Sequence, residues 1–181
     1  MKTIEKEITY FSDPGPDATA GVLTAVQKRL KEGDIKMVVV ASTTGKTGVL
    51  FAKALKGKSH VLAISWKKMD PALKKEIKAN GAEAVEVEDL PLESKDMELA
   101  RKAYYALGQG FKVVIEDVLI AADHKLVEPY IDVISAAGSD VGADTAVVIR
   151  TTRTKDIFSE EKTKKLEIRE VLAMPLKKMW Y

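Results

Sequence analysis

The run MVVVASTTGKTG, residues 37–48, limits what this chain can fold into more than any other segment. The stretch over 35–41, apolar except for Lys36 and mostly β-branched, is typical of a central strand that is covered on both faces, as the strands of parallel sheets are. It stops in a turn of small hydroxyl residues and glycine, and a helical pattern follows over 49–55. A strand, a turn and a helix in this order open a βαβ unit, so the run predicts an α/β fold.

Strand and helix patterns alternate along the rest of the chain. Strands are predicted over 8–11, 35–41, 60–64, 84–87, 131–136, 145–151 and 166–174, the last with the alternation of a half-exposed edge strand. Helices are predicted over 19–32, 49–55, 71–80, 93–107 and 111–126. A length of 181 residues with 46% hydrophobic content fits a single domain, 1–181.

Charge and cysteine content exclude several classes of function. The net charge of +2 comes from 29 basic and 27 acidic residues that are interleaved along the chain, a pattern that gives no support to nucleic-acid binding. The chain has no cysteine, which removes disulfides, thiol nucleophiles and most structural zinc sites. Its two histidines, His60 and His124, are too few for a histidine-liganded metal, so no metal site is predicted.

The same composition bears on where the protein works. The first residues lack the apolar core of a signal peptide, and no apolar run approaches the length of about 20 residues that a membrane span requires. We therefore expect a cytoplasmic protein that does not contact a membrane. Lysine and glutamate are abundant while asparagine occurs only at Asn80, a bias of heat-adapted proteins that points to a thermophile.

The turn after the strand over 35–41 has the chemistry of a phosphate cradle. Backbone N–H groups, three hydroxyls and one ammonium stand at the predicted start of a helix, on Thr43, Thr44, Gly45, Lys46 and Thr47. A P-loop would need another glycine five residues before Gly45, where Val40 stands, so a full wrap around a triphosphate is excluded. A plain strand-to-helix turn and a single-phosphate cradle remain as interpretations.

A second glycine turn follows the strand over 131–136. Gly138 and Gly142 allow a sharp turn, and Asp140 and Asp144 supply carboxylates that accept hydrogen bonds from hydroxyl or ring N–H donors. An ordinary glycine hairpin explains the pattern equally well. If this turn meets the first one in space, the two form one ligand site.

Three carboxylates interrupt an apolar helical pattern over 111–126. Glu116, Asp117 and Asp123 are expected on its solvent side, because unpaired buried carboxylates are costly. Glu116 lies nearest the apolar stripe, and as a buried carboxylate it would be a candidate acid or base. Trp66, just past the strand over 60–64, either stacks on a planar ring or covers the end of the sheet. No arrangement is specific enough to name a catalytic residue.

Several segments together resemble a mostly archaeal family of stand-alone proteins related to the C-terminal domain of pyruvate kinase. They are YFSDPGPDATAGVLTAV, MVVVASTTGKTG, ALGQGFKVVIEDVLIAADHKLV, AAGSDVGADTAVVIR and LEIREVLAMPL. The resemblance implies a three-layer α/β/α domain with a mostly parallel five-stranded sheet of order 3-2-1-4-5, its last strand antiparallel, plus short extra edge strands. In such a sheet the strand order reverses between 35–41 and 131–136, and ligands favour the crevice at that point.

The resemblance also implies a ligand. The similar loop of pyruvate kinase holds a phosphate of an allosteric sugar bisphosphate, a role that would fall here on Ser42, Thr43, Thr44, Gly45, Lys46 and Thr47. Similar family proteins look like binders of flavin mononucleotide (FMN), so we expect a phosphate-bearing small molecule, with FMN as the leading cofactor and a flavin-dependent reaction if there is one. Without the kinase barrel, no kinase activity is expected. A regulatory module that senses a sugar phosphate or nucleotide, and an oligomerisation scaffold built from copies of this chain, are the alternatives.

Overall fold

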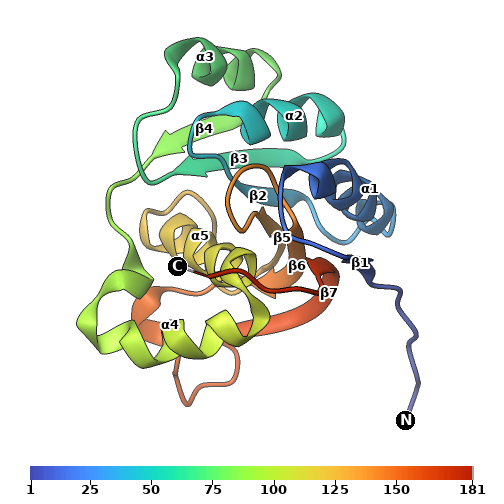
Figure 1. Ribbon diagram of the computed structural model, residues 1–181. Helices are drawn as coiled ribbons and strands as arrows, with labels where there is room; N and C mark the ends of the chain where they lie inside the picture. Colours follow the sequence, from blue (N-terminus) through green and yellow to red (C-terminus); the bar gives the residue numbers. More distant parts are fainter. Residues whose placement is uncertain (181) are drawn as a thin grey trace.

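The structure, a computed structural model, describes residues 1–180 and is built on one open seven-stranded sheet (Figure 1). The strand order is β1-β7-β6-β5-β2-β3-β4. The strands are β1 (Thr9–Phe11), β2 (Met37–Ala41), β3 (His60–Ser65), β4 (Glu83–Glu86), β5 (Asp132–Ala137), β6 (Thr145–Arg150) and β7 (Glu167–Pro175). All seven strands coincide, within a few residues, with the predicted ones.

Strand directions agree with the predicted α/β class. β2 pairs in parallel with both β3 and β5, and β3 pairs in parallel with β4, whereas β6 runs antiparallel to β5. Strands β4, β3, β2, β5 and β6 therefore follow the predicted order 3-2-1-4-5 with an antiparallel last strand. The strand order reverses between β2 and β5, which makes this the switch point of the sheet.

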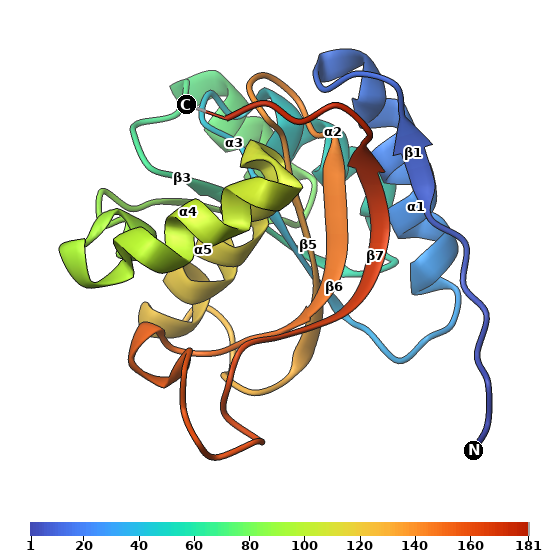
Figure 2. The ribbon, with the colours of Figure 1, turned by 60° about the horizontal axis from the view of Figure 1, so that its bottom comes forward.

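The far end of the sheet corrects the expectation of short extra edge strands. β7 has nine residues and pairs along its length with β6, and β1 lies outside it in the register Thr9 to Ala173 (Figure 2). β1, with three residues, is a short edge strand as expected, but β7 is not, because β6 and β7 form a long antiparallel ribbon. Only the N-terminal part of β7, which β1 does not reach, remains at the edge, and there its residues are alternately exposed and partly buried.

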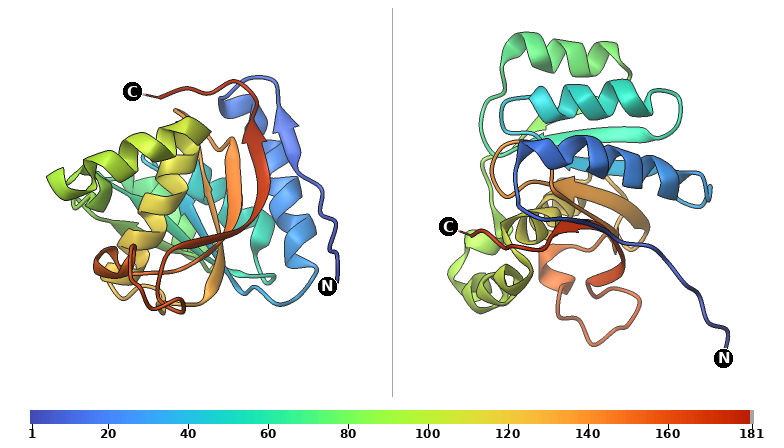
Figure 3. Two further views of the ribbon diagram at one scale, coloured as in Figure 1. Left: turned by 90° about the horizontal axis from the view of Figure 1, so that it is seen from below. Right: turned by 45° about the vertical axis from the view of Figure 1, so that its right-hand side comes forward.

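Helices cover both faces of the sheet (Figure 3). One face carries α1 (Thr19–Leu30), α2 (Lys46–Leu55) and α3 (Pro71–Ala79), and the other carries α4 (Glu98–Tyr104) and α5 (Gln109–Asp123). On β2, Val38 and Val40 belong to the core of the first face and Val39 to the core of the second, and all three are fully buried. This two-sided burial explains the unbroken apolar run that dominates the sequence.

Several helix boundaries differ from prediction, among them that of α5, which spans Gln109–Asp123 where 111–126 was predicted. The predicted helix over 93–107 is broken into short helical turns, of which only α4 is α-helical, because Ser94 is extended and its hydroxyl donates to the Pro91 carbonyl. α2 begins at Lys46, three residues earlier than predicted. Its N-cap Gly45 has a positive φ of 100°, so the turn ends at the glycine and the helix starts directly after it.

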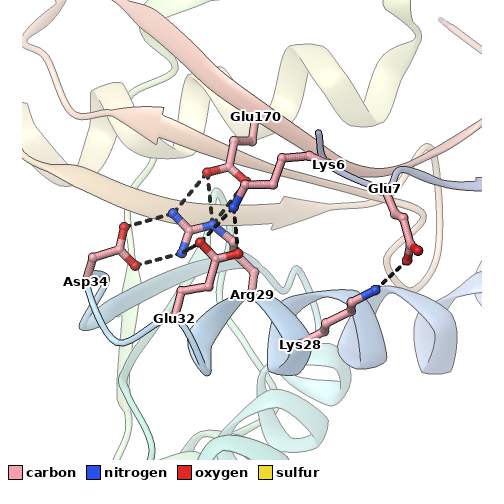
Figure 4. Close-up of polar contacts among 7 residues, drawn as sticks. All are labelled: Lys6, Glu7, Lys28, Arg29, Glu32, Asp34 and Glu170. Atoms are coloured by element: carbon pink, nitrogen blue, oxygen red, sulfur yellow. Dashed lines mark hydrogen bonds and ion pairs between the residues drawn. The ribbon is translucent and has the colours of Figure 1, made fainter. Parts of the chain in front are cut away.

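Ion pairs fasten α1 and the N-terminal segment to the sheet (Figure 4). The Arg29 guanidinium, 7% exposed, donates to Glu170 of β7 and, through two parallel bonds of 2.7 and 2.9 Å, to Asp34. Lys6 donates to Glu32 at 2.6 Å. Among residues 1–180, no helix has the length and apolar character that a membrane crossing would need.

Candidate functional site

A pocket of about 530 Å³ lies at the carboxyl ends of β2, β3 and β5, on the α5 side of the switch point. Its lining comes from the loops after these three strands, from the segment 90–93 and from one stripe of α5. The two predicted loops, 42–48 after β2 and 138–144 after β5, therefore meet around one cavity. Of the predicted site residues, Ser42, Thr43, Thr44, Lys46, Thr47, Gly138, Asp140 and Gly142 line it, and Gly45 and Asp144 do not.

Ser42 and Gly45 shape the first loop. The Ser42 hydroxyl oxygen accepts from the Gly48 N–H at 2.8 Å, and its carbonyl accepts from the Gly45 N–H at 3.2 Å. Gly45 faces α3: a Cβ atom there would lie 2.8 Å from Leu73 Cβ. These contacts fold the chain sharply between β2 and α2, and they turn the residues between Ser42 and Gly48 toward the pocket.

The start of α2 carries backbone donors without protein partners. Among residues 1–180, no hydrogen bond uses the N–H of Thr43, Thr44 or Thr47, and the Lys46 N–H has only a long 3.4 Å contact to the Thr44 hydroxyl. The Lys46 side chain is exposed at the same place and makes no ion pair within the described chain. Free N–H groups, the positive end of a ten-residue helix and an ammonium together suit an anion.

The second loop crosses the pocket from β5. Gly142 has a positive φ of 82°, and a Cβ atom there would lie 2.5 Å from Thr19 Oγ1 and 2.8 Å from Pro16 Cα. A Cβ atom on Gly138 would lie 2.4 Å from the Gly142 carbonyl oxygen. The turn is thus closed on itself and packed against the start of α1, and it leaves the Asp140 carboxylate exposed at the rim.

Asp144 braces this loop from behind instead of facing the pocket. Its side chain is fully buried and accepts from the Ser139 N–H at 2.9 Å, the Gly15 N–H at 3.2 Å and the Thr145 hydroxyl at 2.8 Å. With three donors already bound, it fixes the course of residues 138–144. The sequence pattern identified a carboxylate that matters for this loop, but the structure places it away from the cavity.

One stripe of α5 forms the remaining wall, and it corrects the solvent-side expectation. Glu116 and Asp117 are 4% and 6% exposed, and only Asp123 is exposed. The expectation was wrong because this stripe faces the pocket and the segment 90–93, where polar side chains find partners or line a cavity. The α5 residues of the lining are Gln109, Lys112, Val113, Glu116, Asp117 and Ile120.

Lys112 and Glu116 form a buried ion pair within this stripe. Lys112 Nζ lies 2.6 Å from Glu116 Oε2 and 2.9 Å from Glu93 Oε1, and Glu116 Oε1 accepts from the Leu92 N–H at 3.3 Å. Burial raises the pKa of Glu116 despite the opposing effect of Lys112. Burial disfavours the Lys112 ammonium, but Glu116 and Glu93 outweigh it and raise its pKa. Through its contacts with Glu93 and the Leu92 N–H, the pair holds the segment 90–93 against α5.

The Asp117 side chain, by contrast, has no hydrogen bond within residues 1–180. Its Oδ2 atom is buried without a partner, and burial, followed by the charge of Glu116, raises its pKa well above the usual value. Ser139 Oγ and Gln109 Oε1 are likewise buried without partners. All three side chains line the same pocket.

Trp66 and Lys67 follow β3 and line the pocket at its rim. The Trp66 side chain is 52% exposed, and Lys67 Nζ lies 4.9 Å from the centre of its ring. The indole therefore does not seal the end of the sheet, which leaves its ring available to a ligand. No group of three metal-ligating side chains occurs among residues 1–180.

Sequence reasoning missed Gln109, Lys112, Asp117 and Ser139 as lining residues. A signal was present for the α5 members, because residues 109, 112, 113, 116, 117 and 120 repeat at helical spacing on one face. Lys112 and Glu116 also stand four residues apart, the spacing of a helical ion pair. Ser139 carried no such signal beyond its place in the second glycine turn, between Gly138 and Gly142.

No protein-family model matches the chain. Among solved structures, it is similar to Cryptosporidium parvum pyruvate kinase in complex with ADP, with a TM-score of 0.45 and 13% identity over 74% of this chain and 24% of that one. A second structure of a pyruvate kinase from Cryptosporidium parvum matches with a TM-score of 0.45 and 12% identity, over 74% of this chain and 23% of the other. The chain thus spans about a quarter of these kinases. The likeness is to a pyruvate kinase-like α/β fold, and it carries no argument about ligand or reaction.

Proposed function

We propose that this protein binds a phosphate-bearing small molecule in the pocket at the switch point, with its phosphate at residues 43–47. The observation that carries the proposal is the set of unused N–H groups of Thr43, Thr44 and Thr47 beside the unpaired Lys46 ammonium. Backbone donors at a helix start without protein partners are the usual means of holding an anion. The structure of the loop, with Val40 inside β2, suits one phosphate and not a triphosphate.

FMN is the leading candidate ligand. A cavity of about 530 Å³ is within the range of small-molecule sites. Ile64, Val113 and Ile120 give it an apolar part, and Trp66 stands at its rim, which favours a planar ring over a purely polar ligand. A flavin-dependent reaction would follow only if bound FMN also meets a substrate, so we propose binding and leave the reaction open.

A sugar phosphate or nucleotide, bound for regulation without catalysis, is the second candidate. It is favoured by the exposed Asp140 carboxylate on the loop opposite the cradle, which can accept from sugar hydroxyls.

Thermal denaturation tests the proposal directly. A ligand present at 100 times its Kd stabilises the folded state by about 2.7 kcal/mol, which raises the Tm of a chain of this size by about 5 to 10 °C. The panel is FMN, adenosine monophosphate, ribose 5-phosphate, fructose 1,6-bisphosphate and inorganic phosphate. Bound FMN would also give the purified protein the absorption spectrum of oxidised flavin.

Variants at the two ends of α2 locate the binding site. Lys46→Ala is expected to weaken binding about tenfold, because it removes a charge-assisted hydrogen bond. Lys56→Ala, at the other end of the same helix, is the matched control and should leave affinity unchanged. If no phosphate compound raises the Tm, and Lys46→Ala combined with Thr47→Ala changes nothing, the proposal fails.

A further inference from the structure

Three of the buried side-chain atoms without hydrogen-bond partners gather at one place. Four such atoms occur among residues 1–180, and three of them belong to residues that line the switch-point pocket, Gln109, Asp117 and Ser139, whereas Ser59 does not line it. Buried polar groups are nearly always paired, so unpaired ones in a native structure need an explanation. Their clustering at one cavity points to a ligand that supplies the missing partners.

Asp117 makes the strongest case. Its carboxyl is 6% exposed and has no partner, although Glu116, the next residue on α5, is held by Lys112 and by the Leu92 N–H. Lys112 makes its ion pairs with Glu116 and Glu93 and none with Asp117. A buried carboxyl that the fold leaves unpaired is costly, and such a cost is typical of a binding site.

Ser139 approaches the pocket from the opposite wall. Its N–H donates to the buried Asp144 carboxylate at 2.9 Å, which fixes the backbone. The residue is 2% exposed, and its hydroxyl has no hydrogen-bond partner. A rigid backbone with a free hydroxyl is a prepared hydrogen-bonding group. The cavity thus has an anion cradle on one side and neutral hydrogen-bonding groups on two others.

We propose that Asp117, Ser139 and Gln109 form a second subsite, which binds the uncharged, amide-like edge of a heterocycle whose phosphate lies at residues 43–47. This inference rests on the proposed function and names the chemical class of the ligand. A second anionic group is disfavoured there, because Glu93, Glu116 and Asp140 also line the cavity and Lys112 is already neutralised by two carboxylates.

The protonation of Asp117 fits an amide-like partner. Burial raises its pKa well above the usual value, which favours the protonated carboxyl, and a protonated carboxyl offers one donor and one acceptor side by side. An imide or lactam edge presents the matching acceptor and donor. Flavin and pyrimidine rings have such an edge, whereas ribose 5-phosphate has none.

The test measures dissociation constants by calorimetry for FMN, uridine monophosphate, ribose 5-phosphate and inorganic phosphate. At least one of the two ring compounds should bind about tenfold or more tighter than ribose 5-phosphate. Asp117→Leu should weaken that ring compound about tenfold or more and leave inorganic phosphate unchanged, and Asp117→Asn, which keeps a donor and an acceptor, should restore most of the affinity.

The stability of the ligand-free variants separates a binding role from a structural one. Asp117→Leu should raise the Tm by about 2 °C or more, since the fold loses an unpaired buried carboxyl, whereas Asp117→Asn, which keeps an unpaired polar group, should leave the Tm nearly unchanged. Asp123→Asn is the control on the same helix: its carboxylate accepts from the N–H and hydroxyl of Thr154, so its loss should not raise the Tm or alter affinity.

Three sets of results would overturn the inference. The second subsite is ruled out if the ring compounds bind no more tightly than ribose 5-phosphate, or if Asp117→Leu binds them as tightly as the wild type does. In either case, inorganic phosphate binding that depends on Lys46 would still support the proposed function. A lowered Tm in both Asp117 variants would make Asp117 structural. If neither inorganic phosphate nor any phosphate compound binds, the proposed function fails and the inference falls with it.

Discussion

Lys112 Nζ lies 2.6 Å from Glu116 Oε2, and both side chains are about 95% buried on the pocket face of α5. Glu98 and Lys102 on α4 have the same spacing and the same 2.6 Å separation, but more than half of each side chain is exposed. The two pairs thus have one geometry in two environments. Environment, not distance, decides what such a pair contributes.

Breaking the buried pair should therefore be far more harmful than breaking the exposed one. Lys112→Met is expected to lower the free energy of unfolding by about 3 to 5 kcal/mol, because it leaves Glu116 buried without its partner. Lys102→Met should cost at most about 0.5 kcal/mol. Urea denaturation measures both. Equal losses in the two variants would contradict the assignment, and the double variant Lys112→Met, Glu116→Leu should be less destabilised than the sum of its single variants.

Alanine substitutions at Gly138 and Gly142 of the second loop, with Gly57 outside it as the comparison, separate steric crowding from backbone strain. Gly57 has a positive φ of 73° and open space around its Cβ position, so Gly57→Ala should cost only about 1 kcal/mol for the backbone. Gly138 has no positive φ but would place a Cβ atom 2.4 Å from the Gly142 carbonyl oxygen. Gly138→Ala should cost about 2 kcal/mol or more, and Gly142→Ala, which combines both effects, should cost the most. Gly138→Ala as mild as Gly57→Ala would show that the loop is not closed as described.

The framework of this fold was readable from the sequence because local patterns and global packing agree. The valines of β2 face both cores, so they form one apolar run, and Gly45 ends the loop where the turn needs a positive φ. The prediction of one helix over 93–107 failed for the opposite reason. Its apolar residues have helical spacing, but the Ser94 hydroxyl donates a local hydrogen bond to the Pro91 carbonyl. Periodicity alone does not reveal such a competing contact.

The site was predictable only in part. The two loops were identified because glycine and hydroxyl residues after a strand have a recognisable chemistry. The α5 wall was not, since a carboxylate at helical spacing reads as solvent-facing unless the cavity beside it is known. Asp117 and Ser139 matter through their lack of partners, which is a property of the folded chain and not of either residue type.

The Arg29 cluster should support stability more than the ion pair next to it (Figure 4). Arg29 is 7% exposed with three carboxylate partners, Glu32, Asp34 and Glu170, whereas Lys28, one residue earlier, pairs with Glu7 on the surface. Arg29→Met is expected to cost about 2 to 4 kcal/mol and Lys28→Met at most about 1 kcal/mol. Arg29→Lys should recover little, because an ammonium does not reproduce the paired bonds to Asp34. Chemical denaturation at pH 7 distinguishes these expectations from a uniform small loss.

Acid should weaken the same cluster in a defined range. Hydrogen bonds from Arg29 lower the pKa of Asp34 from 3.8 to about 2. Because the folded-state value is the lower one, this stabilisation is fully present above about pH 4 and is lost as the pH falls toward 2. Asp34→Asn should therefore reduce the loss of stability of the wild type between pH 4 and pH 2. The effect will be small because the Asp34 side chain is 59% exposed, and an unchanged acid slope would contradict the pairing.

Tryptophan fluorescence should report a planar ligand from one residue. The chain has two tryptophans, and only Trp66 lines the pocket, whereas Trp180 lies near the C-terminus. A flavin that stacks on Trp66 will quench its emission, so Trp66→Phe should abolish most of the FMN-induced change and Trp180→Phe should preserve it. Ribose 5-phosphate, which has no ring to stack, should leave the emission of both single-tryptophan proteins nearly unchanged. Quenching that depends on Trp180 instead would show that the flavin ring does not stack on Trp66.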